Sequence, residues 1–207
     1  MEIKTIIQKV KNHSPQILGS KRISKFSVLL PLVEINEEVH ILFEIRSQNL
    51  RRQPGEICFP GGKMDKEDQT TMMTAIRETT EELGISEKNI TQVYPIDYLV
   101  SPFGLIIFPY VAHITDFNSM TINPEEVEEI FTVPLSYFMN KEPEIFHINL
   151  EVKPETNFPF ELIPGGEEYN WRTKKIDENF YIYEGKAIWG LTAQIIKHFV
   201  EIMRGDS

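Results

Sequence analysis

The feature that most constrains this chain is the stretch from Phe59 to Ile85, FPGGKMDKEDQTTMMTAIRETTEELGI. A Pro-Gly-Gly turn leads into a segment with helical periodicity that ends Arg-Glu-Thr-Thr-Glu-Glu-Leu-Gly. Residues three and four apart share a helix face, so Glu78, Glu81 and Glu82 project to one side. Two such carboxylates ~6 Å apart repel by roughly 3 kcal/mol at an effective dielectric near 20. The cluster therefore predicts a bound divalent cation, and its hard oxygen ligands suit magnesium or manganese.

The alternative is a solvated helix face, which is the usual meaning of clustered glutamates. Here a glycine turn, Arg77 and the terminal Gly84 accompany the carboxylates in a fixed order. In that order residues 62–85 resemble the Nudix box, in which a glycine and an acid precede Arg-Glu, Glu-Glu and a closing glycine. The combination favours the metal site.

Two positions depart from the usual box. Gln69 stands where the first acid belongs, with Gly62 one residue too far upstream, and Thr79 replaces an aliphatic residue. A one-residue insertion in the loop would bring Asp68 or Glu67 near the place of the first acid.

The resemblance implies a hydrolase that cleaves a nucleoside diphosphate linked to another group. It implies that Glu78 and Glu82 hold the metal, with Glu81 and the Gly62 carbonyl as further ligands. Arg77 would hold the helix carboxylates in place through a salt bridge. A bound cation neutralises the phosphates and activates a water as nucleophile. Glycines in the turn let the backbone approach the substrate or the metal closely.

A water that attacks phosphorus benefits from a general base, and the sequence offers two sources. One is Glu81 in the helix cluster. The other is the acidic run from Glu125 to Glu129, from which we select Glu126 because many Nudix relatives complete the site with a glutamate from a segment after the sheet. The alternative is that this run is a solvated helix start, favoured by the helix dipole.

The segment before the box, LFEIRSQNLRRQPGEICFPGG from Leu42 to Gly62, narrows the substrate. Its Arg-Ser, Arg, Gly and Phe-Pro-Gly-Gly elements resemble the signature of the coenzyme A pyrophosphatase branch of the Nudix hydrolases. Residues 188–193 (IWGLTA) resemble the closing Trp-Gly-x-Thr-Ala helix of that branch. The resemblance implies cleavage of coenzyme A, or of its thioesters and disulfides, to 3′,5′-ADP and 4′-phosphopantetheine or its derivative.

Five residues of this signature are assigned to substrate binding. Arg46 and Arg51 would bind the phosphates of coenzyme A, because a guanidinium binds phosphate oxygens in pairs; the alternative for each is a surface ion pair. Gly55 and Gly61 belong to the same loop. Phe59 would lie against the adenine or the pantetheine, and a buried aromatic under the loop is the open alternative.

The composition fits this reading. A chain of 207 residues with 41% hydrophobic residues suits a single domain, 1–207. Its net charge of −10 argues against nucleic acid or an anionic membrane as a partner. The single cysteine, Cys58, excludes an intrachain disulfide and indicates a reducing compartment. No run approaches 18 apolar residues and no segment resembles a signal peptide, so we expect a cytoplasmic protein.

Helical and strand-like segments alternate along the chain, which predicts a mixed sheet between helices. The Nudix resemblance implies the same α/β fold, an α/β/α sandwich around a mixed β-sheet. We expect an irregular loop over 46–62 and short helices beginning at Pro124 and Pro134. We also expect helices over 2–12, 70–83 and 187–203, with strands over 27–33, 40–45, 93–100, 105–114, 144–152 and 179–184.

Residues 141–182 are treated as a family-variable insertion. It would close over the pantetheine arm or pack against a second copy of the chain in a homodimer, and the sequence leaves both roles open. The functional alternatives are the same chemistry on NADH, ADP-ribose or a nucleoside triphosphate, and a nucleotide-sensing module that binds without hydrolysis.

Overall fold

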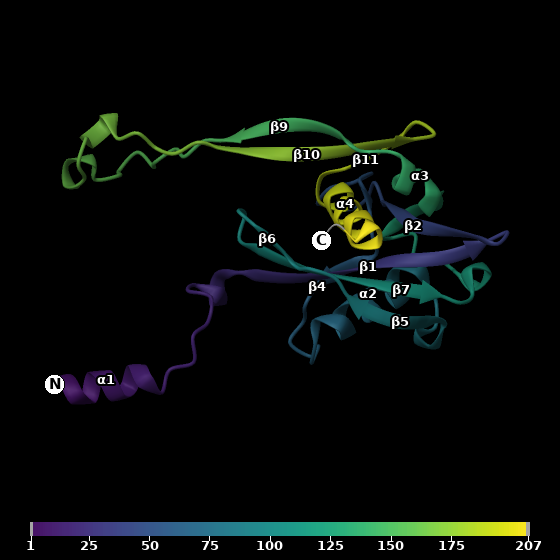
Figure 1. Cartoon of the computed structure of the whole chain (residues 1–207), viewed down its shortest axis with the longest axis horizontal. Helices are drawn as coiled ribbons and strands as arrows, with labels where there is room; N and C mark the ends of the chain where they lie inside the picture. Colours follow the sequence, from purple (N-terminus) through teal and green to yellow (C-terminus); the bar gives the residue numbers. More distant parts are fainter. Residues whose placement is uncertain (1, 206–207) are drawn as a thin grey trace.

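The structure is a computed structural model that describes residues 2–205. Its helices are α1 (Ile3–Lys11), α2 (Thr71–Leu83), α3 (Leu135–Asn140) and α4 (Gly190–Arg204). The main sheet contains β1 (Ser24–Ile35), β2 (Glu38–Arg46), β3 (Ile57–Cys58), β4 (Gly61–Lys63), β5 (Ile90–Pro95), β6 (Leu99–Ser101), β7 (Leu105–Ile114) and β8 (Val127–Pro134). A smaller sheet contains β9 (Glu144–Leu150), β10 (Lys174–Tyr183) and β11 (Lys186–Trp189). Figure 1 shows α4 between the two sheets.

The main sheet is mixed, as predicted. Its central path runs β3-β2-β1-β7-β5, with β4 paired to β1, β6 to β7 and β8 to β2. The pair β1–β7 is parallel, from Ser24↔Leu105 to Leu32↔His113, while the other pairs are antiparallel. A tight turn joins β1 to β2, in which Asn36 and Glu37 both have positive φ.

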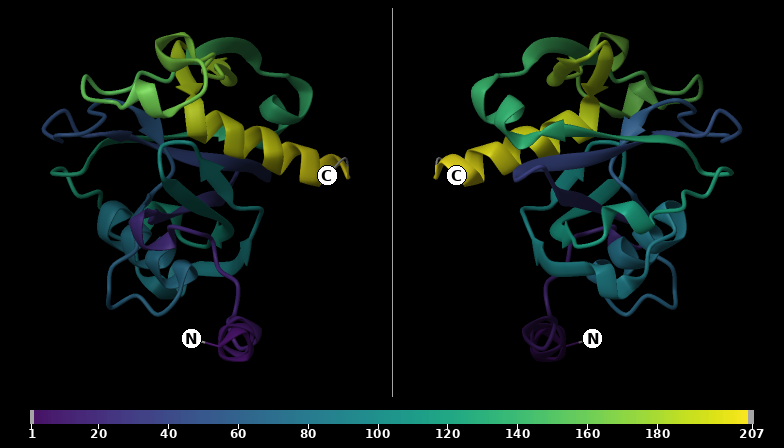
Figure 2. Two further views of the ribbon diagram at one scale, coloured as in Figure 1. Left: turned by 90° about the vertical axis from the view of Figure 1, so that its left-hand side faces the viewer. Right: turned by 90° about the vertical axis from the view of Figure 1, so that its right-hand side faces the viewer.

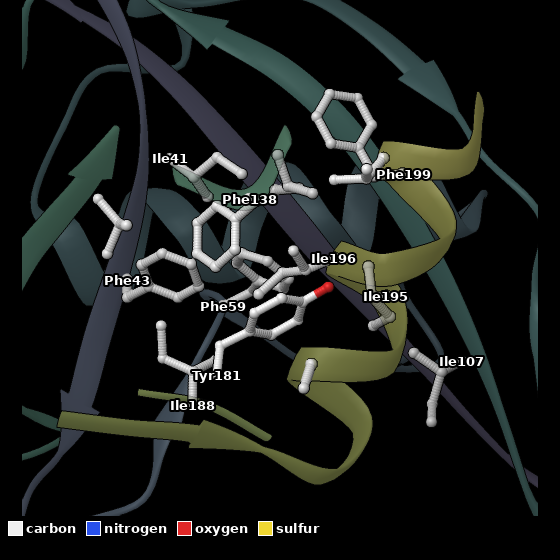
Figure 3. Close-up of a cluster of buried hydrophobic side chains, with 14 residues drawn as sticks. Ile41, Phe43, Phe59, Ile107, Phe138, Tyr181, Ile188, Ile195, Ile196 and Phe199 are labelled. Carbon is white, nitrogen blue, oxygen red and sulfur yellow. The ribbon is translucent and has the colours of Figure 1, made fainter. Parts of the chain in front are cut away.

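Alternating side chains on the central strands separate two cores, one on each face of the main sheet. Leu29 and Leu42 face α2, where they pack with Ala75 and Leu83. Their neighbours in sequence face α4, in a cluster that contains Leu30, Ile41, Phe43, Phe138, Tyr181 and Ile196. Figure 3 shows the aromatic rings of this second cluster meeting α4. The predicted α/β/α sandwich is confirmed, with α2 and α4 covering opposite faces.

Helix α2 has well-defined ends. The Thr70 side chain accepts a hydrogen bond from the Met73 amide (3.2 Å), and Gly84 follows in the left-handed conformation with φ 61°. The core face of α2 is formed by residues that are buried, namely Thr74, Ala75, Thr79, Glu82 and Leu83, whereas Met72 and Met73 are exposed (38% and 43%).

Several predicted boundaries were wrong. The loop over 46–62 contains the short strands β3 and β4, because backbone pairing to β2 and β1 overrides its glycines and prolines. The expected helix from Pro124 is a turn that enters β8. The expected strand over 93–100 is divided into β5 and β6. The expected helix over 187–203 begins only at Gly190, because residues 186–189 pair with β10 as β11.

Residues 141–182 build most of the second sheet. The strands β9 and β10 pair from Glu144↔Phe180 to Leu150↔Lys174, and the chain between them projects away from the main sheet (Figure 1). Phe158, Tyr169 and Trp171 pack edge to face in this projecting end, together with Phe160.

The N-terminal helix α1 stands apart from the rest of the molecule (Figures 1 and 2), and each of its residues is exposed. Within residues 2–205, no helix has both the length and the apolar character needed to cross a membrane.

Candidate functional site

Two consecutive glycines begin β4, the strand that precedes the acidic helix. Gly61 pairs with Val28 of β1 at φ 155°, and a Cβ at this position would collide with the Ser27 carbonyl oxygen. Its amide donates a hydrogen bond to Glu82 Oε2 (2.8 Å). A Cβ on Gly62 would overlap the Glu78 carboxylate. The glycines therefore let both carboxylates lie directly against the backbone of β4.

Arg77 organises the outer side of the cluster. Its Nε and Nη2 donate to the Asp68 carboxylate (3.2 and 3.0 Å). Its Nη2 also reaches Glu78 (2.9 Å), and its Nη1 reaches Glu81 (3.0 Å). The salt bridges expected between Arg77 and the helix carboxylates are thus present in the structure.

Asp68 supplies the acid that the box appeared to lack. Besides the two bonds from Arg77, its carboxylate accepts hydrogen bonds from the Thr74 hydroxyl (3.0 Å) and the Asp65 amide (2.9 Å). The bonds from Arg77 hold the pKa of Asp68 well below its usual range. Of the two acids left open by the sequence, Asp68 contacts Arg77, whereas Glu67 lies exposed on the loop.

The inner side of the cluster has the opposite electrostatics. Burial raises the pKa of Glu82 well above its ordinary value, and the neighbouring charge of Glu44 raises it further. Burial also raises the pKa of Glu78. Carboxylates with raised pKa values hold their negative charge at a cost, which a bound cation would remove.

The acidic run after the sheet reaches the same place. Glu126 adds its negative charge to those acting on Glu78 and Glu82. The loop before it is held against the end of α2, because the Asn123 amide donates to the Glu82 carbonyl (2.9 Å). Elsewhere in the run, Glu129 pairs with Lys186 (3.0 Å).

The arginine-bearing loop is closed at its base. The Gly55 amide donates to the Arg46 carbonyl (3.0 Å), and Gly55 has φ 72° with Gln48 packed against its Cα. Arg46 is half-buried, and its positive charge lowers the pKa of Glu44, whereas Arg51 is exposed on the loop. The structure thus brings Arg46, but not Arg51, beside the carboxylates.

The prediction of a substrate contact for Phe59 was wrong. Its ring is 3% exposed and stacks on Phe43 with centroids 5.2 Å apart, in the core that faces α4. Side chains alternate along the chain, so the ring of Phe59 points into this core while its neighbour Cys58 lies against Glu44. The buried-aromatic alternative is therefore the observed one.

Comparison with known proteins identifies the family. The family model described as "NUDIX domain" matches residues 27–155. The chain belongs to the Nudix family.

Three relatives illustrate how far the similarity extends. The Nudix chain is 36% identical over 124 residues to "Peroxisomal coenzyme A diphosphatase NUDT7" of Mus musculus, covering 60% of this chain and 52% of that protein. It is 42% identical over 113 residues to "Peroxisomal coenzyme A diphosphatase ndx-8" of Caenorhabditis elegans, covering 50% and 45%. It is 31% identical over 175 residues to "Uncharacterized Nudix hydrolase NudL" of Photorhabdus laumondii, covering 84% and 82%. The match spans about half the length of the first two relatives.

Among solved structures, a MutT/nudix family protein from Enterococcus faecalis superposes with a TM-score of 0.49 at 16% identity, covering 99% of this chain and 70% of that one.

The donors around the Nudix helix have the chemistry that a hard dication requires. Within residues 2–205, no three His, Cys, Asp or Glu side chains stand close enough together to enclose an ion as they are arranged. Glu78 and Glu82 nevertheless lie against the glycines of β4, and the negative charge of Glu78 raises the pKa of Glu82. Their oxygen donors and their excess negative charge fit magnesium or manganese.

One residue of this site escaped the sequence analysis. Glu44 is completely buried on β2, and its carboxylate accepts a hydrogen bond from the Cys58 thiol (3.2 Å). Burial and the neighbouring Glu44 raise the pKa of Cys58 well above its usual range, so the thiol stays protonated and can donate to Glu44. The signal for Glu44 was present in the sequence, as the lone charge inside the apolar run Ile41–Ile45.

The closing Trp-Gly-x-Thr-Ala segment is tied to the same region of the Nudix domain. The Thr192 hydroxyl, at the start of α4, donates to the Ile57 carbonyl on β3 (3.2 Å). The C-terminal helix therefore supports the strand that carries Cys58 toward Glu44.

Proposed function

We propose that this Nudix hydrolase cleaves the pyrophosphate bond of coenzyme A or of its acylated or oxidised derivatives. Water would be added across the P–O–P bond, giving 3′,5′-ADP and 4′-phosphopantetheine or its derivative. The observation that carries the proposal is the Arg-Ser, Arg, Gly and Phe-Pro-Gly-Gly segment from Arg46 to Gly62, joined directly to the box. Two relatives named coenzyme A diphosphatases, at 36% and 42% identity over about half of their length, support it.

The metal-holding residues would be Glu78 and Glu82, with Glu81 and the Gly62 carbonyl as further ligands. A bound magnesium or manganese ion supplies charge neutralisation of the phosphates and a more acidic water. Arg77 fixes the outer carboxylates, since it is bound to Asp68, Glu78 and Glu81 at once.

We assign the general base to Glu126. It would take the proton that the attacking water loses as the new P–O bond forms. Glu81 is the second candidate, but its carboxylate is already engaged with Arg77 (3.0 Å). Glu126 belongs to a different segment and shares the electrostatic environment of Glu78 and Glu82.

Two arginines would bind the anions of the substrate. Arg46 lies beside the carboxylates and would bind the pyrophosphate. Arg51, on the exposed loop closed by Gly55, would reach the 3′-phosphate of the ribose. In both cases a planar guanidinium matches phosphate oxygens in pairs.

Substrate competition tests this proposal. Purified protein with magnesium or manganese would be offered coenzyme A, NADH, ADP-ribose and a nucleoside triphosphate, and the products identified by mass spectrometry. We expect the highest kcat/KM for coenzyme A or one of its derivatives. Faster turnover of NADH, ADP-ribose or the nucleoside triphosphate than of coenzyme A would assign the enzyme to another Nudix substrate class. Binding of these compounds without hydrolysis of any of them would favour the nucleotide-sensing module.

A single substitution tests the metal mechanism. Glu82→Gln should lower kcat by at least about 100-fold, since the carboxylate that carries the cation is lost. The exposed Glu128→Gln, on β8, is the matched control and should retain activity. Full activity of Glu82→Gln in magnesium would refute the mechanism.

Cellular location and assembly state are the subjects of two further proposals. We propose a cytoplasmic protein, although two relatives are named peroxisomal, and fluorescence microscopy of the tagged chain would check it. We propose a homodimer, which light scattering on the purified protein would detect; contact of residues 141–182 with a second copy and their closure over the pantetheine arm stay alternatives.

A further inference from the structure

Glu44 occupies a position where a carboxylate is costly. It is 0% exposed and lies in the middle of the main sheet, paired with Cys58 of β3 on one side and Ile130 of β8 on the other. Its Oε1 accepts the Cys58 thiol hydrogen bond, while its Oε2 is buried and finds no hydrogen-bond partner among residues 2–205. A buried charge without full compensation costs several kcal/mol, on the order of a domain's net stability. The residue therefore needs a further partner.

The side chain of Glu44 is directed toward the acidic helix. Alternation along β2 puts Glu44 on the same face as Leu42, which packs against α2. Glu82 lies on α2 and is only 4% exposed. Of the neighbouring charges that raise the pKa of Glu82, the charge of Glu44 has the largest effect. Glu44 and Glu82 thus approach one another from the sheet and from the helix.

The charges around Glu44 leave a deficit of positive charge. Glu78, Glu82 and Glu126 act on it with the same sign as its own. The opposing cation is Arg46, two residues along β2, and its Nε is likewise buried with no hydrogen-bond partner in the described chain. Arg77 neutralises Glu78 from the outer side of the cluster. On the inner side, Arg46 faces Glu44, Glu82 and Glu126, so the space between β2 and α2 keeps an excess of negative charge.

We propose that Glu44 is a further carboxylate ligand of the divalent cation, supplied by the sheet and facing Glu82 across the site. Cys58 is its positioning residue: the thiol holds Oε1, which leaves Oε2 for the ion. Outer partners of this kind orient metal ligands and affect metal affinity by about 10–100-fold. The inference rests on the proposed function in one respect only, that this site holds a cation.

The test reads metal binding directly, without turnover. Mn²⁺ would be titrated into the metal-stripped protein and free Mn²⁺ followed by electron paramagnetic resonance. Glu44→Gln preserves the shape of the side chain and removes its charge, so we expect Mn²⁺ affinity to fall by at least about tenfold. The control Glu128→Gln, an exposed carboxylate on the neighbouring strand β8, should bind Mn²⁺ within about twofold of the wild type.

Thermal unfolding gives an independent readout. Without metal, Glu44→Gln should melt at or above the wild-type temperature, since the substitution removes a buried charge. The rise in melting temperature on adding Mn²⁺ should be smaller than in the wild type, because ligand stabilisation follows affinity. Wild-type Mn²⁺ affinity in a folded Glu44→Gln would overturn the proposal and leave Glu44 as a neutral acid of the core.

A second pair of variants covers the case in which Glu44→Gln does not fold. Cys58→Ala removes the donor to Oε1 and should weaken Mn²⁺ binding several-fold, whereas Cys58→Ser keeps a donor and should restore it. Equal Mn²⁺ affinity in the two variants would also refute the proposal. If the wild type binds Mn²⁺ but leaves coenzyme A intact, the substrate assignment fails while the role of Glu44 stands. If the wild type binds no Mn²⁺, both fail.

Discussion

At the scale of single residues, Arg77 shows how one cation organises several acids. It binds Asp68 through two nitrogens and also reaches Glu78 and Glu81. The Asp68 side chain is only 7% exposed, so this pair is better shielded than an ordinary surface salt bridge. Arg77 and the three glutamates were identifiable from the sequence because the helix period fixes their relative positions. The first acid was narrowed only to Asp68 or Glu67, because the conformation of a loop does not follow from a periodic pattern.

Removing the Asp68 charge tests this organisation. Asp68→Asn should lower the free energy of unfolding by about 2 kcal/mol at pH 7, since charge-assisted hydrogen bonds to Arg77 are lost. Urea unfolding would measure the change. Asp65→Asn is the matched control, because Asp65 is exposed and stands 3.8 Å from the same guanidinium. The difference between wild type and Asp68→Asn should disappear as pH falls through the lowered pKa of Asp68.

The buried glutamates predict the opposite pH dependence. Burial raises the pKa of Glu82 and Glu44, so their contribution to stability is full below their usual pKa and is lost as pH rises through the raised values. In a chelator, the free energy of unfolding should fall by more than about 1 kcal/mol between pH 5 and pH 9. Glu82→Gln should flatten this profile. If the free energy of unfolding changed with pH equally in the wild type and in Glu82→Gln, the raised pKa of Glu82 would be contradicted.

At the scale of elements, helix α2 and its two ends were predictable because capping chemistry is local. Thr70 and Gly84 act through neighbours one to four residues away. The short strands β3 and β4 were missed because they pair with β2 and β1, which lie elsewhere in the sequence. The helix expected from Pro124 failed for the same reason, since pairing of β8 with β2 decides that segment.

The end of α2 also positions the loop that carries Glu126. Gly84 has φ 61°, and a Cβ there would collide with the Thr121 carbonyl oxygen. Gly84→Ala should therefore destabilise the protein by more than about 1 kcal/mol, and displacement of residues 121–126 should lower kcat. Gly104→Ala is the matched control, because Gly104 has φ 75° with open space around it. If Gly84→Ala and Gly104→Ala lowered the free energy of unfolding and kcat equally, the positive φ alone would explain the loss, and the contact with Thr121 would have no role.

At the scale of the whole molecule, the sequence predicted the layers but not the second sheet. Strand and helix periodicity sufficed for a mixed sheet between α2 and α4. The sheet of β9, β10 and β11 depends on pairing across the polar residues 151–173, which carry little periodic signal. Glu44 stands out in the sequence as the lone charge of an apolar run, but its complete burial beside Glu82 follows only from the assembled fold.

The projecting end of the β9–β10 hairpin offers a test at this scale. Its residues lie away from the main sheet, and those between 151 and 173 are exposed or half-buried (Figure 1). Replacing 153–171 by Asn-Gly should leave the melting temperature within a few degrees and kcat within about threefold, because the two main cores are untouched. A large rise in KM for coenzyme A, with kcat unchanged, would instead favour closure over the pantetheine arm. A loss of dimer mass would favour the subunit contact.

The contact between Asp68 and Arg77 has a consequence for how relatives of this chain are found. The loop from Gly62 is one residue longer than usual and the acid is one methylene shorter, yet the carboxylate still meets the guanidinium. Two changes that each break a fixed-spacing motif compensate one another in space. A search that demands the standard interval would discard such proteins, so chains that carry this arrangement extend beyond those the consensus retrieves.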